Sequence, residues 1–527
     1  MNDILTLLIL FGVLVFCIYY IVPKKHRYLV LLISSIIFYA IYSKFMICFI
    51  IVTIISIYFA GIFMNKLDDK FTKEKENLEK EQRKILKAKI KRKKLLILVV
   101  AILLNILILT LLKYSGFIAS IFEGIFSWFN LTLKLPILKL MLPLGISYYT
   151  LSAIGYMIDV YRGKYRGDTN FFKVALFVSY FPQLYEGPFA TYDKLAPQLY
   201  EGNEFDSKNA FSGLLLIVFG VLKKIVIADR LNILVSDIFK NYTSYHGLVV
   251  LLGIILFTFQ LYAEFSAAID IAVGSSEMLG IKLAKNFNQP FVSQSVNEFW
   301  RRWHISLGAW FREYIFYPVS MSKGMMKFNK KIHGKVSKFF ELFLTSALPL
   351  FLVWFTNGLW HGANWLYVIY GLYYYILMML GMINEAIGNK FYKKFNINKD
   401  NKVLVYLRIF RTFIFVNIGM LIFKCALSSS TISETFNVFA SIFSGGKLNL
   451  ISLKVIDIYD TIFCALGILT LLIIDVLKEH KIDLREKISN SNVFIKFIVL
   501  LIIIFVIVIF GAYGDGYIPA DPIYGGF

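Results

Sequence analysis

The chain has 527 residues, of which 58% are hydrophobic and only 17% are charged, and its mean hydropathy is +0.66. This composition excludes a soluble globular fold. The formal net charge of +22 does not indicate a nucleic-acid partner, because the basic residues gather in loops between apolar runs and no recognisable RNA- or DNA-binding module frames them. We therefore expect an all-α integral membrane protein whose basic loops contact anionic lipids on the cytoplasmic side.

Apolar runs follow one another along the chain. Six of them are Ile4–Val22, Phe45–Met64, Leu95–Leu112, Leu214–Ala228, Val403–Phe423 and Val493–Phe510, of which Leu214–Ala228 and Val403–Phe423 are interrupted by the pairs Lys223/Lys224 and Arg408/Arg411. Each approaches or reaches the ~20 residues that cross a hydrocarbon core of about 30 Å. With less regular segments added, the sequence predicts about eleven spanning or membrane-embedded helices. The first run follows Met-Asn-Asp rather than a basic region, so we expect a retained span and not a signal peptide.

The largest group of charges lies between Asn65 and Lys94, where alternating Lys and Glu are followed by a wholly basic run. This pattern predicts a solvated helix. If Lys24–Arg27 is cytoplasmic, counting spans also places this loop inside, as its basic excess requires. The same alternation places the N-terminus and the tail after Phe510 on the extracytoplasmic side.

No internal repeat or long soluble linker divides the chain, so we expect a single membrane domain over residues 1–527. Its expected parts are N-terminal spans (1–135) with the charged cytoplasmic loop 65–94, a core (136–385), C-terminal spans (386–510) and a tail (511–527). The segment from about Leu142 to Trp365 has most of the polar residues that lie in apolar context. Because a charge at the centre of a membrane helix costs about 2.5–3.5 kcal/mol on insertion scales, this concentration indicates a functional interior.

Few residues offer metal-binding or nucleophilic chemistry. The four cysteines lie singly in or beside apolar runs, so we expect no disulfide and no zinc site. Four of the six histidines lie near lysines in loops or in a polar turn: His26, His246, His333 and His480. The candidates for chemistry are therefore His304 and His361.

His304 lies in a segment, Asn297–Tyr314, where aromatic and aliphatic residues recur at three- and four-residue steps. This periodicity predicts one amphipathic helix. Its polar face would carry Glu298, Arg301, His304, Gly308 and Arg312. On periodicity alone the helix packs at an interface or lines a polar cavity, and His304 is either a hydrogen-bonded structural residue or a functional one.

His361 lies at the end of a largely apolar run. If the segment is helical, Asn357 and Asn364 lie on its face and can fix the tautomer of the imidazole. Gly358 and Gly362 would let a neighbouring chain or a ligand approach closely. A neutral histidine, with a pKa of about 6.5, can take a hydroxyl proton without carrying a buried charge at rest, as a membrane-embedded general base requires. The alternative is a core histidine that ties two helices together.

Five blocks follow in chain order: Leu142–Tyr149 with Asp159–Gly163, Phe181–Pro188, Lys223–Arg230, Phe299–Leu307 and Gly358–Trp365. They resemble the successive motifs of the membrane-bound O-acyltransferase (MBOAT) family, and most of all its alginate and peptidoglycan O-acetyltransferases and the related D-alanyl transfer protein of teichoic acid synthesis. The resemblance implies a helical bundle around a central tunnel, with His361 as catalytic base and His304 lining the tunnel. Residues expected to shape or orient the cavity are Asn357, Asn364, Trp360, Arg301, Arg302 and Trp303.

Two further segments bear on the substrate. The block Leu261–Gly274 departs from the alginate-type pattern because Ala267, Ala268 and Ile269 replace three groups, two of them hydroxylated, which affects the expected acceptor but not the reaction class. The ending Ile523–Phe527 is similar to a Tyr-x-x-Phe ending proposed in this family, or in its partner peptides, to carry the acyl group as a tyrosyl ester. Tyr524 is thus a candidate acyl relay, since a phenol leaves more readily than a sugar alcohol. The alternative is a disordered tail with an aromatic end.

The sequence therefore predicts an O-acyltransferase of the bacterial cytoplasmic membrane that acetylates an extracytoplasmic polysaccharide or cell-wall polymer. We expect acetyl-CoA or an acyl-carrier thioester as the donor, no permanently bound cofactor and no metal. The resemblance also implies a separate extracytoplasmic SGNH-type acyltransferase as partner. Two alternatives stay open: D-alanyl transfer from a carrier protein to teichoic acid, and a polysaccharide exporter or flippase, which would show repeat symmetry.

Overall fold

The computed structural model describes residues 3–131, 134–135, 141–245, 247–445 and 458–513. They form two compact units. The N-terminal unit contains Asp3–Leu214 and Ala272–Ala284, and the C-terminal unit contains Leu215–Ile271 and the described part of Lys285–Tyr524. Helices α10 (Ser207–Leu222) and α13 (Leu248–Met278) contribute residues to both units. The single membrane domain expected from the sequence stays a prediction.

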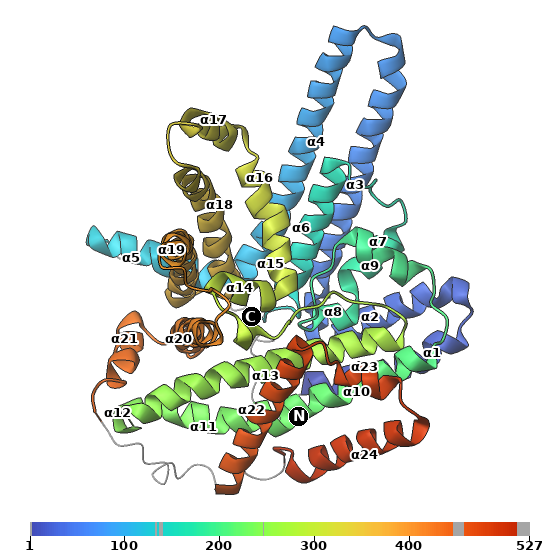
Figure 1. Cartoon of the computed structure of the whole chain (residues 1–527). Coiled ribbons are helices and arrows are strands. Elements are labelled where there is room, and N and C mark those ends of the chain that lie inside the picture. Colours follow the sequence, from blue (N-terminus) through green and yellow to red (C-terminus); the bar gives the residue numbers. More distant parts are fainter. Residues whose placement is uncertain (1–2, 132–133, 136–140, 246, 446–457, 514–527) are drawn as a thin grey trace. The chain divides into compact units, whose positions relative to one another are not determined.

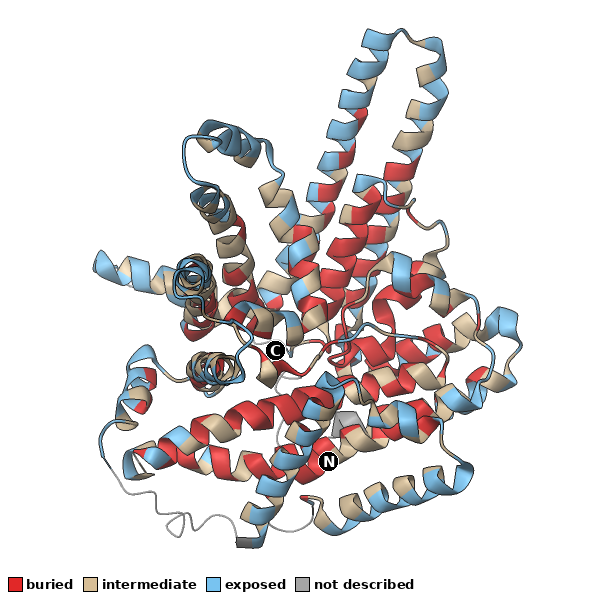
Figure 2. Cartoon of the chain, viewed as in Figure 1, coloured by how far each residue is buried: buried red, intermediate tan, exposed pale blue. Residues whose placement is uncertain are grey.

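The N-terminal unit packs around α6 (Ile146–Arg162), which is buried along almost its whole length (Figure 2). A helix that is buried on every side is typical of a bundle interior. Helix α6 packs against α3 (Ile47–Glu74) and α4 (Lys80–Leu109). The other helices of this unit are α1 (Asp3–Ile21), α2 (Arg27–Ser43), α5 (Ser115–Trp128), α7 (Phe171–Ser179), α8 (Phe181–Leu184) and α9 (Tyr192–Tyr200).

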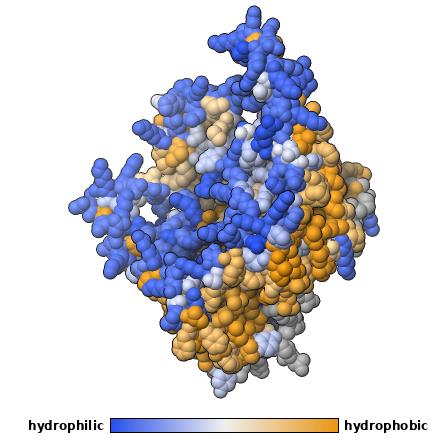
Figure 3. Space-filling view, turned by 90° about the vertical axis from the view of Figure 1, so that its right-hand side faces the viewer, coloured by the Kyte–Doolittle hydropathy of each residue, from blue (hydrophilic) through white to orange (hydrophobic). Residues whose placement is uncertain are grey.

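Helices α3 and α4 extend beyond their neighbours in this unit as a long hairpin with an exposed, hydrophilic tip (Figures 1–3). The segment 65–94, predicted to be a solvated helix, is helical but turns at Lys75–Asn77. The turn ends where Glu79 and Gln82 form a reciprocal capping box at the start of α4. The charged segment therefore belongs to two antiparallel helices and not to one.

The C-terminal unit is also built from helices, and no strand occurs in the part of the chain that the structure describes. A π-helical turn, η5 (Lys223–Ala228), leads into α11 (Asp229–Lys240) and α12 (Tyr242–Tyr245). After α13 come α14 (Val296–Arg302), α15 (Ile305–Phe311), a π-helical turn, η7 (Arg312–Phe316), α16 (Tyr317–Ser320), α17 (Lys323–Ile332), α18 (Lys338–His361) and α19 (Trp365–Lys394). The chain ends with α20 (Lys402–Leu427), α21 (Ile432–Ser441), α22 (Ile458–Glu479), α23 (Leu484–Ser489) and α24 (Val493–Phe510).

Among the described residues, nine helical segments are long and apolar enough to cross a membrane, and two shorter apolar helices accompany them. Many large apolar side chains are exposed, and Figure 3 shows them as broad orange surfaces away from the hydrophilic tip. Helix α24 is the extreme case, since none of its residues is buried although its sequence is almost wholly apolar. Such a helix requires a hydrocarbon solvent. The prediction of an all-α polytopic membrane protein is confirmed.

Glycines set the packing of α18 against α19, the two helices on which the candidate site depends. A Cβ built at Gly358 would overlap the carbonyl oxygen of Tyr367, and one built at Gly371 would overlap that of Trp354. The two backbones therefore approach more closely than any side chain at these positions would allow. The close approach predicted for Gly358 is confirmed, and the neighbouring chain is α19.

Candidate active site

His361 is the last residue of α18, and only 3% of its surface is exposed. Four rings surround the imidazole: Trp360 at a centroid distance of 5.0 Å, Phe423 at 5.2 Å, Tyr370 at 5.7 Å and Tyr367, nearly parallel to it, at 6.2 Å. These rings come from α18, α19 and α20. Packing from three helices thus fixes the orientation of the ring.

The helix ends at His361, whereas the sequence analysis carried the same helical face on to Asn364. Gly362 leaves the helix with an extended backbone. Asn364 instead caps α19, because its side-chain oxygen accepts the backbone N–H of Leu366 at 2.9 Å. The prediction that Asn364 neighbours the imidazole on a continuous helix is therefore wrong. Asn357 does lie one turn before His361 and is buried.

His304 stands at a break between α14 and α15. Its φ is 48° and its ψ is 50°, a left-handed conformation that is uncommon for residues with a side chain. The predicted continuous amphipathic helix is wrong at this point. Two backbone hydrogen bonds from a neighbouring loop replace helical ones: Asn288 N–H donates to Arg302 O at 2.9 Å, and Ile305 N–H donates to Asn286 O at 3.0 Å.

The same loop holds the His304 side chain. The Asn286 side-chain oxygen lies 3.2 Å from His304 Nδ1, 3.1 Å from Ser306 N and 2.8 Å from Ser306 Oγ. Burial lowers the pKa of His304 to about 3, so its ring is neutral at physiological pH. Sequence reasoning missed Asn286, because it lies outside every recognised block and reaches His304 only through the fold.

Both histidines line one narrow cavity of about 50 Å³ in the C-terminal unit. Its lining residues are Trp300, Trp303, His304, Leu307, Gly308, Phe311, Val353, Trp354, Asn357 and His361. The structure therefore brings together four residues that the sequence analysis assigned to one site: His304, His361, Asn357 and Trp303. Trp360 joins them through its ring, which lies 5.8 Å from that of His304 and 5.0 Å from that of His361.

A second, larger cavity of about 280 Å³ lies next to the first. The two share Trp300, Gly308, Val353 and Trp354 as lining residues. The larger cavity is also lined by Arg301 and Arg312, both exposed, so it reaches the protein surface. Neither arginine has an ion-pair or hydrogen-bond partner among the residues that the structure describes.

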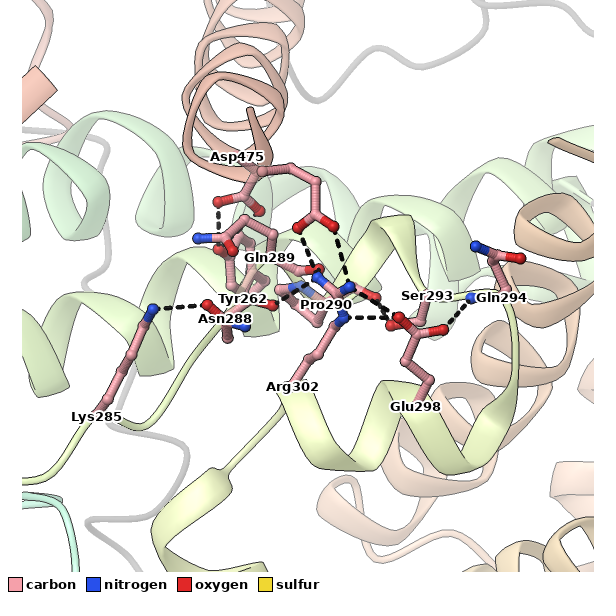
Figure 4. A network of polar contacts seen from close by, with 11 residues as sticks. Tyr262, Lys285, Asn288, Gln289, Pro290, Ser293, Gln294, Glu298, Arg302 and Asp475 are labelled. Carbon is pink, nitrogen blue, oxygen red and sulfur yellow. Dashed lines mark hydrogen bonds and ion pairs between the residues drawn. The ribbon is translucent and has the colours of Figure 1, made fainter. Parts of the chain in front are cut away.

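The two arginines of the predicted pair have different roles. Arg301 lines the larger cavity, but Arg302 lines neither cavity. Instead, Arg302 Nε donates to Glu298 Oε1 at 3.0 Å, and its two terminal nitrogens bind the Glu479 carboxylate at 2.7 and 3.0 Å (Figure 4). The prediction that Arg302 shapes the cavity is wrong for these cavities. Arg302 ties α14 to α22.

Figure 4 also shows a second contact to α22, in which the Tyr262 hydroxyl donates to the Asp475 carboxylate at 2.9 Å. Tyr262 belongs to α13, and its ring packs near Trp303 at 5.9 Å. Both contacts therefore end close to the break that holds His304. This support from a helix late in the chain was not predicted from the sequence.

A buried ionic network joins two of the sequence blocks. Lys223 Nζ lies 2.7 Å from Asp270 and from Ser266 Oγ, and Lys224 Nζ lies 3.0 Å from Glu264. Both lysines belong to the η5 turn, whereas the other three residues belong to α13. The partners of these lysines, Glu264, Ser266 and Asp270, all belong to the block Leu261–Gly274. Buried charges of this kind persist only when paired.

Two further expectations concern the acyl relay and a metal site. Tyr524 lies outside the described residues. Within residues 3–131, 134–135, 141–245, 247–445 and 458–513, no three His, Cys, Asp or Glu side chains come together as a metal-ligand set.

Comparison with known proteins identifies the family of this chain. Residues 34–430 match the membrane-bound O-acyltransferase family. The probable alginate O-acetylase AlgI of Pseudomonas aeruginosa is 31% identical over 437 residues, covering 83% of this chain and 73% of that protein. The peptidoglycan O-acetyltransferase of Helicobacter pylori is 30% identical over 353 residues, covering 62% of this chain and 61% of that protein. The teichoic acid D-alanyltransferase of Bacillus subtilis is 30% identical over 285 residues, covering 53% of this chain and 68% of that protein. Because the family match spans well over half of the sequence, this chain belongs to the membrane-bound O-acyltransferase family and is a multi-pass membrane O-acyltransferase.

Proposed function

We propose that this enzyme moves an acetyl group from a cytoplasmic thioester across the bacterial cytoplasmic membrane, for O-acetylation of an extracytoplasmic polysaccharide or cell-wall polymer. The observation that carries the proposal is the single cavity lined by both His304 and His361. The alginate and peptidoglycan acetylases among the relatives support the acetyl group and the extracellular acceptor. The N- and C-termini are proposed to face outward, on the basic-loop argument.

In the proposed reaction, His361 takes the proton of an incoming hydroxyl, whose oxygen attacks the thioester carbonyl. A C–O bond forms, the C–S bond breaks, and the proton returns from the imidazolium to the departing thiolate. The products are an ester and a free thiol. A base in this role contributes about 10²–10⁴ in rate.

Trp300 is the proposed donor to the carbonyl oxygen, which gains negative charge as the bond forms. Its side chain lines both cavities, and its Nε1–H is buried without a hydrogen-bond partner in the described part of the chain. Loss of one such donor costs about 10²–10³ in kcat. We expect Trp300→Phe, which keeps an aromatic ring, to lower acetyl transfer by at least about tenfold, measured as acetate ester formed by purified enzyme. Activity equal to that of the native protein would reject this role.

The donor is proposed to enter through the larger cavity. Coenzyme A and acyl-carrier proteins share a phosphopantetheine arm, a long chain that ends in a phosphate. The guanidinium groups of Arg301 and Arg312, which have no partner among the described residues, suit that phosphate. The donor is not bound permanently, and no metal is required, because a thioester is already activated.

The acceptor of the first transfer is proposed to be Tyr524, with a separate extracytoplasmic SGNH-type acyltransferase completing the reaction. The tail begins at a fixed point of the C-terminal unit. Ala512 N–H donates to Ile225 O at 3.0 Å, and an Arg230 nitrogen donates to Phe510 O at 2.7 Å. Removal of residues 524–527 should abolish acetylation of the polymer while the protein still accumulates. Undiminished acetylation would reject the relay.

D-alanyl transfer to teichoic acid is the second candidate function, because the Bacillus subtilis enzyme matches about half of the chain. The decisive experiment is chemical analysis of esters on the extracellular polymers of a deletion strain. Loss of acetate esters, restored by the native gene but not by His361→Gln, would support the proposal. Loss of D-alanine esters with normal acetate would replace it with the second candidate.

A further inference from the structure

Asn286 lies in the loop between α13 and α14, and only 2% of its surface is exposed. Among the described residues, its side-chain oxygen Oδ1 contacts His304 Nδ1, Ser306 N and Ser306 Oγ. Its Nδ2 has no hydrogen-bond partner among the described residues. The orientation of this amide is therefore set by its oxygen alone.

One of these contacts decides the chemistry of the others. The backbone N–H of Ser306 can only donate, so the Asn286 atom that faces it at 3.1 Å must be the carbonyl oxygen and not the amide nitrogen. A carbonyl oxygen has no hydrogen to give. His304 Nδ1 must then carry the hydrogen of the bond between the two side chains. In a neutral imidazole the lone pair is consequently on Nε2.

The main chain of the same residue reinforces this arrangement. Asn286 O accepts the N–H of Ile305, the residue that follows His304. The strained left-handed backbone of His304 is thus held on both sides by the Asn286 loop. The ring is enclosed by Phe265 at 4.8 Å and Trp360 at 5.8 Å, so packing also limits its rotation.

We propose that Asn286 is a positioning residue that fixes His304 as the Nδ1–H tautomer, so that the cavity receives a hydrogen-bond acceptor from His304 and not an N–H donor. This step rests on the proposed attack of a hydroxyl on a thioester. An N–H on Nε2 would donate to the attacking oxygen and hold one of its lone pairs, which weakens that oxygen as a nucleophile. The Nδ1–H tautomer places no such donor beside the oxygen, so the hydroxyl gives its proton to His361 and keeps its lone pairs for the attack on the carbonyl carbon.

The test reads the tautomer directly. Protein labelled with ¹⁵N-histidine is compared with a His304→Gln variant, and the difference spectrum isolates this ring from the other five histidines. We expect a protonated Nδ1 and an unprotonated Nε2 in the native protein. We expect the same signature in Asn286→Asp, whose carboxylate still accepts all three hydrogen bonds, and a loss of the protonated Nδ1 signal in Asn286→Ala.

Activity measurements supply the matched control. Ser306→Ala removes one donor to Asn286 but keeps the Ser306 backbone N–H that orients the amide, so its acetyl transfer should stay within about threefold of native. Asn286→Ala should lose at least about tenfold in kcat, and Asn286→Asp should restore part of this loss. A native ring protonated on Nε2, or an Asn286→Ala variant that keeps both the Nδ1–H signal and full activity, would overturn the proposal.

The two proposals can fail separately. If Asn286→Ala does not fold, the native, Asn286→Asp and Ser306→Ala spectra still decide the tautomer. A native spectrum with the expected tautomer, together with normal acetate esters in the deletion strain, would reject the proposed function but not the assignment of the ring.

Discussion

His304 and His361 reach one cavity by different local means. His361 needs only the end of a helix, since the chain leaves α18 at Gly362 and starts α19 three residues later. His304 needs a left-handed turn that a separate loop stabilises. The first arrangement is local in the sequence, whereas the second depends on the tertiary fold.

Replacement of His361 by Gln should remove acetyl transfer almost completely, by at least about 10²-fold, because His304, the other histidine that lines the cavity, has a pKa of about 3 and is too weak a base to replace it. The measurement is the acetate ester content of extracellular polymer in a complemented deletion strain, with protein level checked in membranes. His333→Gln is the matched control, since His333 is exposed and bonded to Glu341 in a loop. Equal esters in the two strains would contradict the assignment of His361.

Burial of His304 predicts a pH-dependent stability. Its pKa is about 3 in the folded protein and about 6.5 in an unfolded chain, so between these values the unfolded state binds an extra proton. Stability from this residue is therefore present above pH 6.5 and falls as the pH drops towards 3. The thermal midpoint of detergent-solubilised protein should fall less between pH 7 and pH 5 in His304→Gln than in the native protein. An identical fall would show that His304 is not buried in the neutral form.

At the level of elements, the closely packed helices α18 and α19 contain His361 and three of the four aromatic rings that surround it. Gly358→Ala should push the two backbones apart, because its Cβ overlaps the Tyr367 carbonyl. We expect a loss of about 1–3 kcal/mol in stability, from overpacking, and at least tenfold in activity. Thermal unfolding and ester content measure the two effects.

Gly381→Ala on α19 is the control for this experiment. Nothing lies within 4 Å of a Cβ at that position, so the substitution should leave activity unchanged and raise helix stability by up to about 1 kcal/mol. A Gly358→Ala variant as active as Gly381→Ala would contradict the packing argument.

The sequence predicted which helices exist more reliably than where they break. Apolar periodicity continues from Phe299 through Leu307, so it gave no sign of the interruption at His304. Two hydrogen bonds from Asn286 and Asn288 make that break stable, and a loop contact of this kind has no periodic signal. Motif resemblance identified His304, His361 and Trp303, but it could not distinguish Arg301, at the cavity, from Arg302, which faces Glu479.

At the scale of the whole molecule, the late helix α22 supports the site in the C-terminal unit. Glu479 binds Arg302, one residue before Trp303, and Asp475 binds Tyr262, whose ring packs against Trp303. Sequence analysis treated the C-terminal spans as an addition to the core. The structure instead makes one of them a support for the turn that presents His304.

Glu479→Gln should therefore reduce activity by about two- to fivefold although residue 479 lines neither described cavity. The ion pair is partly exposed, so its contribution to global stability should stay below about 1 kcal/mol. Glu486→Gln, at an exposed position on α23, is the matched control and should leave the activity unchanged. If the two variants have the same activity, α22 does not support the site.

The narrow space between the histidines has a consequence for what the enzyme can carry. A site of about 10–15 Å³ on the same measure holds one water, so about 50 Å³ admits only a few non-hydrogen atoms. Trp300, Trp303 and Trp354 form stiff walls that a long fatty chain could enter only by displacing them. We therefore expect the tryptophans to favour short acyl groups such as acetyl and to exclude lipid-length chains, although the enzyme is surrounded by lipid.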